Sequence, residues 1–274
     1  MRAAVGDDGS FVSGVRGSLG LKLEVIILIL YYYTGQKFLR TILQEKQVKL
    51  SRYGRYGSLN DPFEQAAYDT SDRELRRVHK EQINKFALMI GLICLSETRH
   101  SPAMWAHYTD NHEGACLEIE VADDHVFKVK YQGEKLFPGL TLAGFKEKVN
   151  IDNIKEVLGT KSEDWSYEKE QRLHVPLTPD KVRKMGENYF LPFQEHEDNV
   201  FMLRRVFVGY RCGKGILNIR EDVKDYPKKV EVIQTRPSFR RFEVIDQVCK
   251  RFWNMDECEK GNEHTLPAVK AVFG

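Results

Sequence analysis

The chain has 274 residues, of which 42% are hydrophobic and 30% are charged. These values are ordinary for a globular protein and exclude disordered, collagen-like and coiled-coil proteins. The chain has 42 Lys and Arg residues and 40 Asp and Glu residues, so the formal net charge is only +2. Such a balance argues against a protein that coats DNA. The five cysteines show no CxxC or Cys/His spacing, so we expect no disulfide framework, no structural zinc and a reducing, cytoplasmic setting.

Composition divides the chain into three parts. Residues 1–22 are rich in Gly and Ser without an apolar period, and we expect a disordered leader there, or an over-long start of the gene. The apolar run 25–30, extended by three tyrosines, is too short to span a membrane and predicts a buried strand. Residues 23–245 are expected to form a single domain, and residues 246–274 a C-terminal tail with a short helix.

Periodicity predicts alternating helices and strands along this domain. Thr34 is a candidate N-cap for a helix with apolar residues at 38, 39, 42 and 43, and Ser71 with Glu74 forms a capping-box pattern for a second helix. Ser101 and Pro102 are the expected N-cap and first position of a helix at 101–110. Further helices are expected at 141–159 and 216–225, and strands at 88–95, 115–121, 126–131, 171–177, 204–209, 230–235 and 240–245. The order lacks strict βαβ alternation. It therefore predicts an α+β domain with a mixed or antiparallel sheet and flanking helices.

Four clusters combine polar, aromatic and rigid residues. The first is the tyrosine run that contains Tyr32, where a ring could stack on a planar ligand or simply join the core. The second contains Asn60, Asp61 and Glu64, in an Asn-Asp-Pro turn or a ligand site. The third follows a buried strand and contains Ser96, Trp105, His107 and Tyr108, with core packing as the alternative role. The fourth contains Glu168, Glu170 and Arg172. In an extended segment the two carboxylates share one face, either as a catalytic pair or as a surface pair with Lys169 and Arg172.

These clusters occur in an order that resembles the DUF2971 family of bacterial proteins of unknown function. The matching stretches are Leu30–Thr34, Ser58–Glu64, Cys94–Ser96, Met104–Tyr108, Asn111–Gly114 and Trp165–Arg172. The resemblance covers about residues 23–245 and implies one domain, but the family carries no established activity.

The chain also shows a weaker similarity to ADP-ribosyltransferases, which place three motifs on successive strands around NAD. That similarity implies an ADP-ribosyltransferase-like fold in which Tyr32 contacts NAD and Ser96 orients the nicotinamide side. Glu170 would hold the ribose and stabilise an oxocarbenium ion, and Glu168 would assist a protein or nucleic-acid acceptor. The similarity departs from the pattern at the first motif, where a tyrosine stands in place of Arg or His. It implies a transferase that is a toxin or a phage-defence effector.

Three alternatives stay open. Residues 201–253 contain 13 Lys or Arg and 6 Asp or Glu, a local charge of +7, with aromatic residues between them. This pattern indicates a nucleic-acid-binding or nucleic-acid-processing protein, or a solvated basic face. A non-catalytic sensor in a defence system would have a pocket without converging carboxylates. A nuclease could gather Asp61, Glu64, Glu168 and Glu170 around Mg²⁺.

Overall fold

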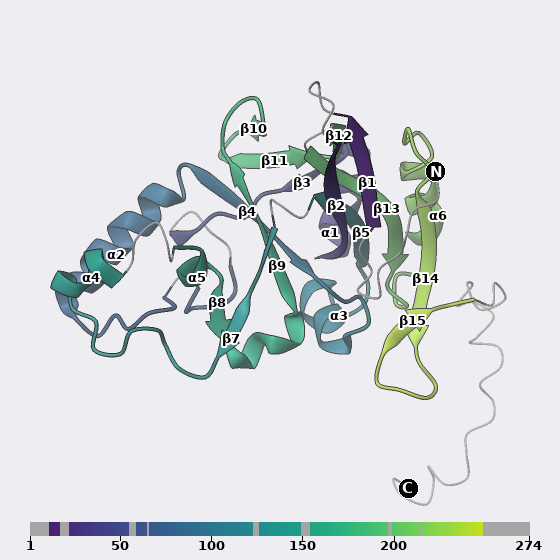
Figure 1. Ribbon diagram of the computed structural model, residues 1–274. Coiled ribbons are helices and arrows are strands. Elements are labelled where there is room, and N and C mark those ends of the chain that lie inside the picture. The colour runs from purple at the N-terminus through teal and green to yellow at the C-terminus, as the bar shows by residue number, and fades with distance from the viewer. Residues whose placement is uncertain are drawn as a thin grey trace, which may run out of the picture.

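The computed structural model describes residues 11–16, 22–54, 59–64, 66–122, 126–148, 154–196, 199–213 and 215–248. Its centre is a large β-sheet with the strand order β15-β14-β13-β5-β2-β4-β9-β6, in which β1 also pairs with β2 and β12 with β13 (Figure 1). The strands are β1 (Phe11–Arg16), β2 (Lys22–Thr34), β4 (Ile90–Ser96), β5 (Ala115–Ala122), β6 (Val126–Lys128), β9 (Glu170–Pro176), β12 (Gln194–His196), β13 (Asn199–Val208), β14 (Glu231–Pro237) and β15 (Val244–Asp246). Within this sheet, strands β13 and β14 run parallel, whereas its other described pairs are antiparallel.

Helices and two small sheets surround this sheet. The helices are α1 (Gln36–Glu45), α2 (Arg73–Phe86), α3 (Pro102–Tyr108), α4 (Leu142–Lys148), α5 (Ile154–Leu158), α6 (Gly215–Asp222) and the 3-10 helix η3 (Glu163–Glu168). One small sheet joins β10 (Arg183–Met185), β11 (Asn188–Pro192) and β3 (Gln47–Lys49), and the other pairs β7 (Lys130–Gln132) with β8 (Thr160–Ser162). The predicted α+β class with a mixed sheet is confirmed.

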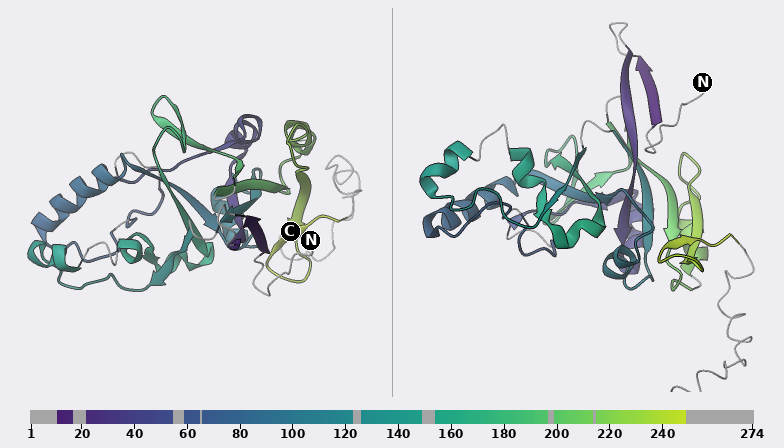
Figure 2. Two further views of the ribbon diagram at one scale, coloured as in Figure 1. Left: turned by 45° about the horizontal axis from the view of Figure 1, so that its top comes forward. Right: turned by 60° about the horizontal axis from the view of Figure 1, so that its bottom comes forward.

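The large sheet is covered on both faces. Leu39 and Leu43 of α1 and Ile216 of α6 pack on one face, in the main core. Met104 and Trp105 of α3 pack on the other face, in a second core. Helices α2 and α4 lie at the opposite end of the molecule from α6 (Figures 1 and 2). Strand β5 shows the effect of this double cover: the predicted inward row at 115, 117, 119 and 121 is buried, and so are Cys116 and Glu118 on the other face.

The sheet nearly divides between β2 and β4. These two strands share one register pair, Tyr31 with Ser96, whereas β4 follows β9 from Ile90 to Ser96. Strand β2 continues instead along β5, from Ile27 to Thr34. The two strands therefore diverge on either side of Tyr31, and side chains from both can face a common space there.

The structure differs from the predicted leader and strand ends. Residues 11–16 form β1, an antiparallel partner of residues 22–27 of β2, and this pair projects from the sheet (Figure 2, right). Residues 1–10 and 17–21 lie outside the described residues. So do residues 249–274 of the tail predicted at 246–274, whose first residue, Asp246, ends β15. The strand predicted at 240–245 begins only at Val244, after a turn.

Two of the predicted N-caps are displaced by one residue, whereas the predicted N-cap of α3, Ser101, is confirmed. The α1 N-cap is Gly35 rather than Thr34, and its side-chain acceptor comes from a distant residue: the Gln36 N–H donates to Asp110 at 2.8 Å. The α2 N-cap is Asp72 rather than Ser71, and its carboxylate accepts from the Leu75 N–H at 2.8 Å. A carboxylate satisfies a free N–H and complements the helix dipole in both cases.

A left-handed turn follows α3 and explains part of the family motif. Asp110, Asn111 and His112 have φ values of 49°, 54° and 71°, which cost conformational energy for non-glycine residues. Gly114 closes the turn, and a Cβ there would lie 2.2 Å from the carbonyl oxygen of Thr34. The motif residues 111–114 thus hold α3 against the end of β2. Among the described residues, no helix has both the length and the apolar character to cross a membrane.

Candidate functional site

Three predicted motifs meet on one line across the large sheet. Tyr31 of β2, rather than the predicted Tyr32, is the register partner of Ser96 of β4, and Ser96 is the register partner of Glu170 of β9. Register partners in antiparallel strands project from the same face. Residues 31, 96 and 170 are therefore brought side by side where β2 and β4 diverge.

A cavity of about 380 Å³ occupies this divergence. That volume lies within the range of small-molecule sites. Of the predicted site residues, the following line it: Tyr32, Asn60, Glu64, Ser96, His107, Tyr108, Glu168 and Glu170. Lys49, Ser51, Lys161 and the flanking residues of the tyrosine run line it as well. Residues separated by more than a hundred positions thus converge on one cavity.

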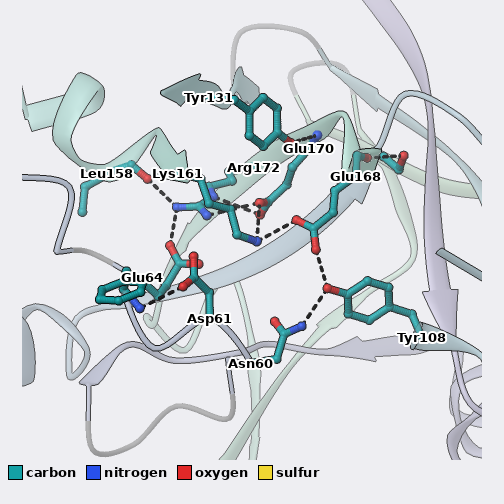
Figure 3. A network of polar contacts seen from close by, with 12 residues as sticks. Asn60, Asp61, Glu64, Tyr108, Tyr131, Leu158, Lys161, Glu168, Glu170 and Arg172 are labelled. Atoms are coloured by element: carbon teal, nitrogen blue, oxygen red, sulfur yellow. Dashed lines mark hydrogen bonds and ion pairs between the residues drawn. The ribbon is translucent and has the colours of Figure 1, made fainter. Parts of the chain in front are cut away.

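Glu168 is held by a lysine and a tyrosine (Figure 3). Its Oε2 accepts from Lys161 Nζ at 2.6 Å, and its Oε1 accepts from the Tyr108 hydroxyl. That hydroxyl in turn accepts from the Asn60 amide at 2.8 Å. Both carboxylate oxygens are therefore fixed in position although they face the cavity.

Glu170 is held mainly by Arg172. The Nε of Arg172 lies 2.9 Å from Glu170 Oε1 and its Nη2 lies 3.2 Å from Oε2, with Lys161 Nζ at 3.4 Å (Figure 3). A guanidinium suits such two-oxygen contact because its donors are fixed in a plane. Arg172 also approaches Glu64 at 2.7 Å and donates to the Leu158 carbonyl at 2.5 Å. We call these five charged residues, Glu64, Lys161, Glu168, Glu170 and Arg172, the buried ionic network.

Burial and charge compete within this network. Burial raises the pKa of Glu64, and Arg172 only partly offsets it. Burial also acts to raise the pKa of Glu170, but Arg172 and Lys161 outweigh it and lower that pKa below its ordinary value. The pKa of Lys161 is raised because Glu170 and Glu168 outweigh the effect of burial. Glu170 is thus a carboxylate kept ionised at the cavity wall.

The two glutamates were predicted to lie on an extended segment, but the structure shows otherwise. Glu168 ends η3, Lys169 has a left-handed φ of 45°, and Glu170 begins β9. The carboxylates nevertheless come together because Lys161 contacts both. The Ser96 hydroxyl donates to the Glu168 carbonyl at 2.6 Å and accepts from the Thr98 N–H at 3.2 Å. Ser96 therefore fixes the backbone at Glu168.

The tyrosine run contributes to both sides of the cavity. Tyr32 packs against the main core, and burial raises its pKa to about 12. Tyr31 and Tyr33 belong to the α3 face, where the Tyr33 hydroxyl donates to the Thr98 carbonyl at 2.9 Å. His107 is exposed, and its ring is stacked with that of Tyr167 at 6.0 Å between ring centres. The cavity thus offers several aromatic faces.

Three predicted site residues lie elsewhere. Trp105 is fully buried in the core beneath α3, where its indole donates to the Arg99 carbonyl at 2.7 Å. Arg172 is fully buried behind Glu170 and positions it. Asp61 forms the predicted turn by accepting from the Phe63 N–H at 2.8 Å, and it lines a neighbouring cavity.

Sequence reasoning missed Lys161, the central cation of the network. Its side chain is only 5% exposed. A lysine nine residues before Glu170 matches no known motif spacing. The only available signal was that two carboxylates close together, if buried, need a cation near both of them. The magnesium hypothesis fits poorly, since Lys161 and Arg172 stand among its proposed carboxylates. Among the described residues, no three His, Cys, Asp or Glu side chains gather as metal ligands.

Fold and site together define an α+β domain with a cavity of about 380 Å³ at a divergence in its sheet. Residues 104–173 match the family described as "Protein of unknown function (DUF2971)". These residues run from α3 to β9 and include most of the ionic network, so the predicted resemblance to this family is confirmed over that stretch. Searches of curated proteins and of solved structures found no match.

Proposed function

We propose that the chain is an NAD-dependent, ADP-ribosyltransferase-like enzyme whose reaction takes place in this cavity. One observation carries the proposal: Tyr32, Ser96, His107, Glu168 and Glu170 line a single cavity. These residues were selected from the sequence alone, and their positions in the chain do not require that they meet.

The lining of the cavity suits the nicotinamide riboside half of NAD. Tyrosine rings provide stacking surfaces for the planar nicotinamide. Formally, three carboxylates face two cations in the ionic network, which favours a positively charged ring and a positively charged transition state. Lys49 is exposed at the cavity and provides a cation for a phosphate. It lies on β3, apart from the tyrosine run in which the family pattern has Arg or His.

The proposed reaction breaks the bond between the ribose C1′ and the nicotinamide nitrogen. The electron pair of that bond leaves with nicotinamide, and a lone pair of the acceptor forms the new bond to C1′. The ionised carboxylate of Glu170 stabilises the oxocarbenium-like transition state, as carboxylates do in glycoside cleavage. Glu168 takes the proton that the acceptor loses, and Tyr108 and Lys161 hold it in place.

Release of nicotinamide from NAD by the purified chain tests the proposal. We expect turnover in the wild type and a loss of at least a hundredfold in kcat for Glu170→Gln, because an oriented charge at the transition state is removed. Glu168→Gln should lose less when water is the acceptor. Glu163→Gln, at an exposed position of η3, is the matched control and should retain full activity.

Circular dichroism separates loss of activity from loss of folding in these variants. Absence of nicotinamide release by a folded wild type, with and without a cell extract as acceptor, would overturn the proposal. Equal turnover in wild type and Glu170→Gln would do the same. A non-catalytic sensor would be favoured if Glu168 and Glu170 pointed away from any cavity. Both residues line the cavity instead.

A further inference from the structure

The loop between β14 and β15 carries two almost fully exposed phenylalanines among arginines. Phe239 is 88% exposed and Phe242 is 98% exposed. Residues 236–243 also contain three arginines and one glutamate. We call this segment the Phe-Arg loop. Exposed aromatic residues of this kind mark interaction sites in folded proteins.

The loop is held in a defined shape by its own hydrogen bonds. The Ser238 N–H donates to the Glu243 carbonyl at 2.8 Å, and Ser238 Oγ accepts from the Arg240 and Arg241 N–H groups at 3.3 Å. Register pairing of Pro237 with Val244 closes its base. The rings therefore face solvent from a structured turn.

One ring already carries a stacked guanidinium. The Arg236 Cζ lies 4.3 Å from the centre of the Phe239 ring. The high exposure of Phe239 leaves the rest of this ring free for a second planar group. Arg240 and Arg241 are exposed, and Arg241 lies 4.0 Å from the carboxylate of Glu243. The loop thus presents ring faces and cations side by side.

We propose that the Phe-Arg loop binds single-stranded nucleic acid, with bases stacked on Phe239 and Phe242 and phosphates on the arginines. Aromatic faces beside cations are the general means by which proteins hold single strands, whose bases are free to stack. The position of Arg240 and Arg241 between the two rings argues against insertion into a bilayer. Both rings could enter the hydrocarbon only if two guanidinium groups followed them, which is costly.

The loop is connected to the cavity through α3. Val244 N–H donates to the His100 carbonyl at 3.0 Å, and Arg99 pairs with Asp246 at 2.6 Å. The α3 helix begins at Pro102, and Tyr108 at its other end contacts Glu168. Seven helical residues span about 10 Å. These contacts join the base of the loop to one wall of the cavity, and the binding inference stands independently of the proposed reaction.

Fluorescence anisotropy of labelled 12-nucleotide rU and dT strands tests the proposal with the full chain and without NAD. We expect binding at 50 mM salt that weakens as salt is raised. The double variant Phe239→Ala/Phe242→Ala should raise Kd by about tenfold or more. Phe239→Trp/Phe242→Trp should bind as well as the wild type. The double variant Arg240→Ala/Arg241→Ala should reduce the slope of log K against log salt by about 1.4.

Phe38→Ala is the matched control. Phe38 is 57% exposed on α1 and has Lys37 over its ring at 5.6 Å, so it shares the chemistry of the loop but not its place. The proposal is overturned if neither strand binds, if both loop double variants bind as the wild type does, or if a matched duplex binds equally well. Binding to vesicles of phosphatidylglycerol and phosphatidylcholine without binding to the oligonucleotides would overturn it in favour of a membrane partner.

Discussion

The buried ionic network and the Phe-Arg loop both place arginine near glutamate, but in opposite surroundings. The Lys161 and Arg172 side chains are 5% and 0% exposed, and each contacts two carboxylates. The Arg241 side chain is 76% exposed and meets one carboxylate at 4.0 Å. Water solvates the loop cations whether or not they have a partner, whereas the network cations depend on their carboxylates. The difference indicates that the network determines stability and site geometry, while the loop cations stay available for a partner.

Removal of Arg172 should have the largest effect on stability. We expect Arg172→Met to lower the free energy of unfolding by about 3–5 kcal/mol, because Glu64 and Glu170 would remain buried without their main cation. Urea unfolding monitored by circular dichroism measures the effect. A loss below about 1 kcal/mol would mean that water reaches these carboxylates.

Removal of Lys161 should have a smaller effect. Glu170 keeps Arg172 and Glu168 keeps Tyr108, so we expect Lys161→Met to cost about 1.5–3 kcal/mol. Adding Glu168→Gln to this variant should restore part of the loss, because the charge left unpaired is then removed. A double-mutant cycle with strictly additive effects would contradict a direct coupling of Lys161 to Glu168.

The pH dependence of stability should come from the buried region. His174 stacks on Phe127 at 4.6 Å between ring centres, and burial and Arg172 lower its pKa from 6.5 to about 3. The unfolded chain binds a proton at His174 below pH 6.5 and the folded chain does not. The contribution of His174 is therefore present above pH 6.5 and is lost as pH falls towards 3.

The variant His174→Phe isolates this contribution. Between pH 6 and 4, wild-type stability should fall relative to the variant by up to about 1.4 kcal/mol per pH unit. Urea unfolding over a pH series measures the difference, and the two proteins should show a constant difference above pH 7. A constant difference down to pH 4 would show that His174 titrates normally in the folded chain.

A surface pair should show the smallest effect. Arg77 and Glu81 of α2 lie 3.2 Å apart with exposed side chains. We expect Arg77→Ala to lower the free energy of unfolding by about 0.3–0.5 kcal/mol, and by less at high salt. A loss comparable with that of Lys161→Met would remove the contrast between buried and exposed charge on which these predictions rest.

Local signals in the sequence predicted most elements of the fold. Alternation located β5, the apolar runs located β2 and β4, and the N-cap and proline at 101–102 located α3. Those signals act between near neighbours in the chain. The predicted caps at Thr34 and Ser71 were displaced, and the one at α1 could not have been found locally, since its partner Asp110 lies 74 residues away.

The sequence by itself determined the α+β class, the family resemblance and the residue types of the candidate site. Only the tertiary structure decided how they are used. It placed Ser96 between Tyr31 and Glu170, assigned Arg172 to hold Glu170 from behind, and inserted Lys161 between two glutamates that are not on an extended segment. Strand register and shared counter-ions depend on contacts between distant parts of the chain, and no local pattern of residues encodes them.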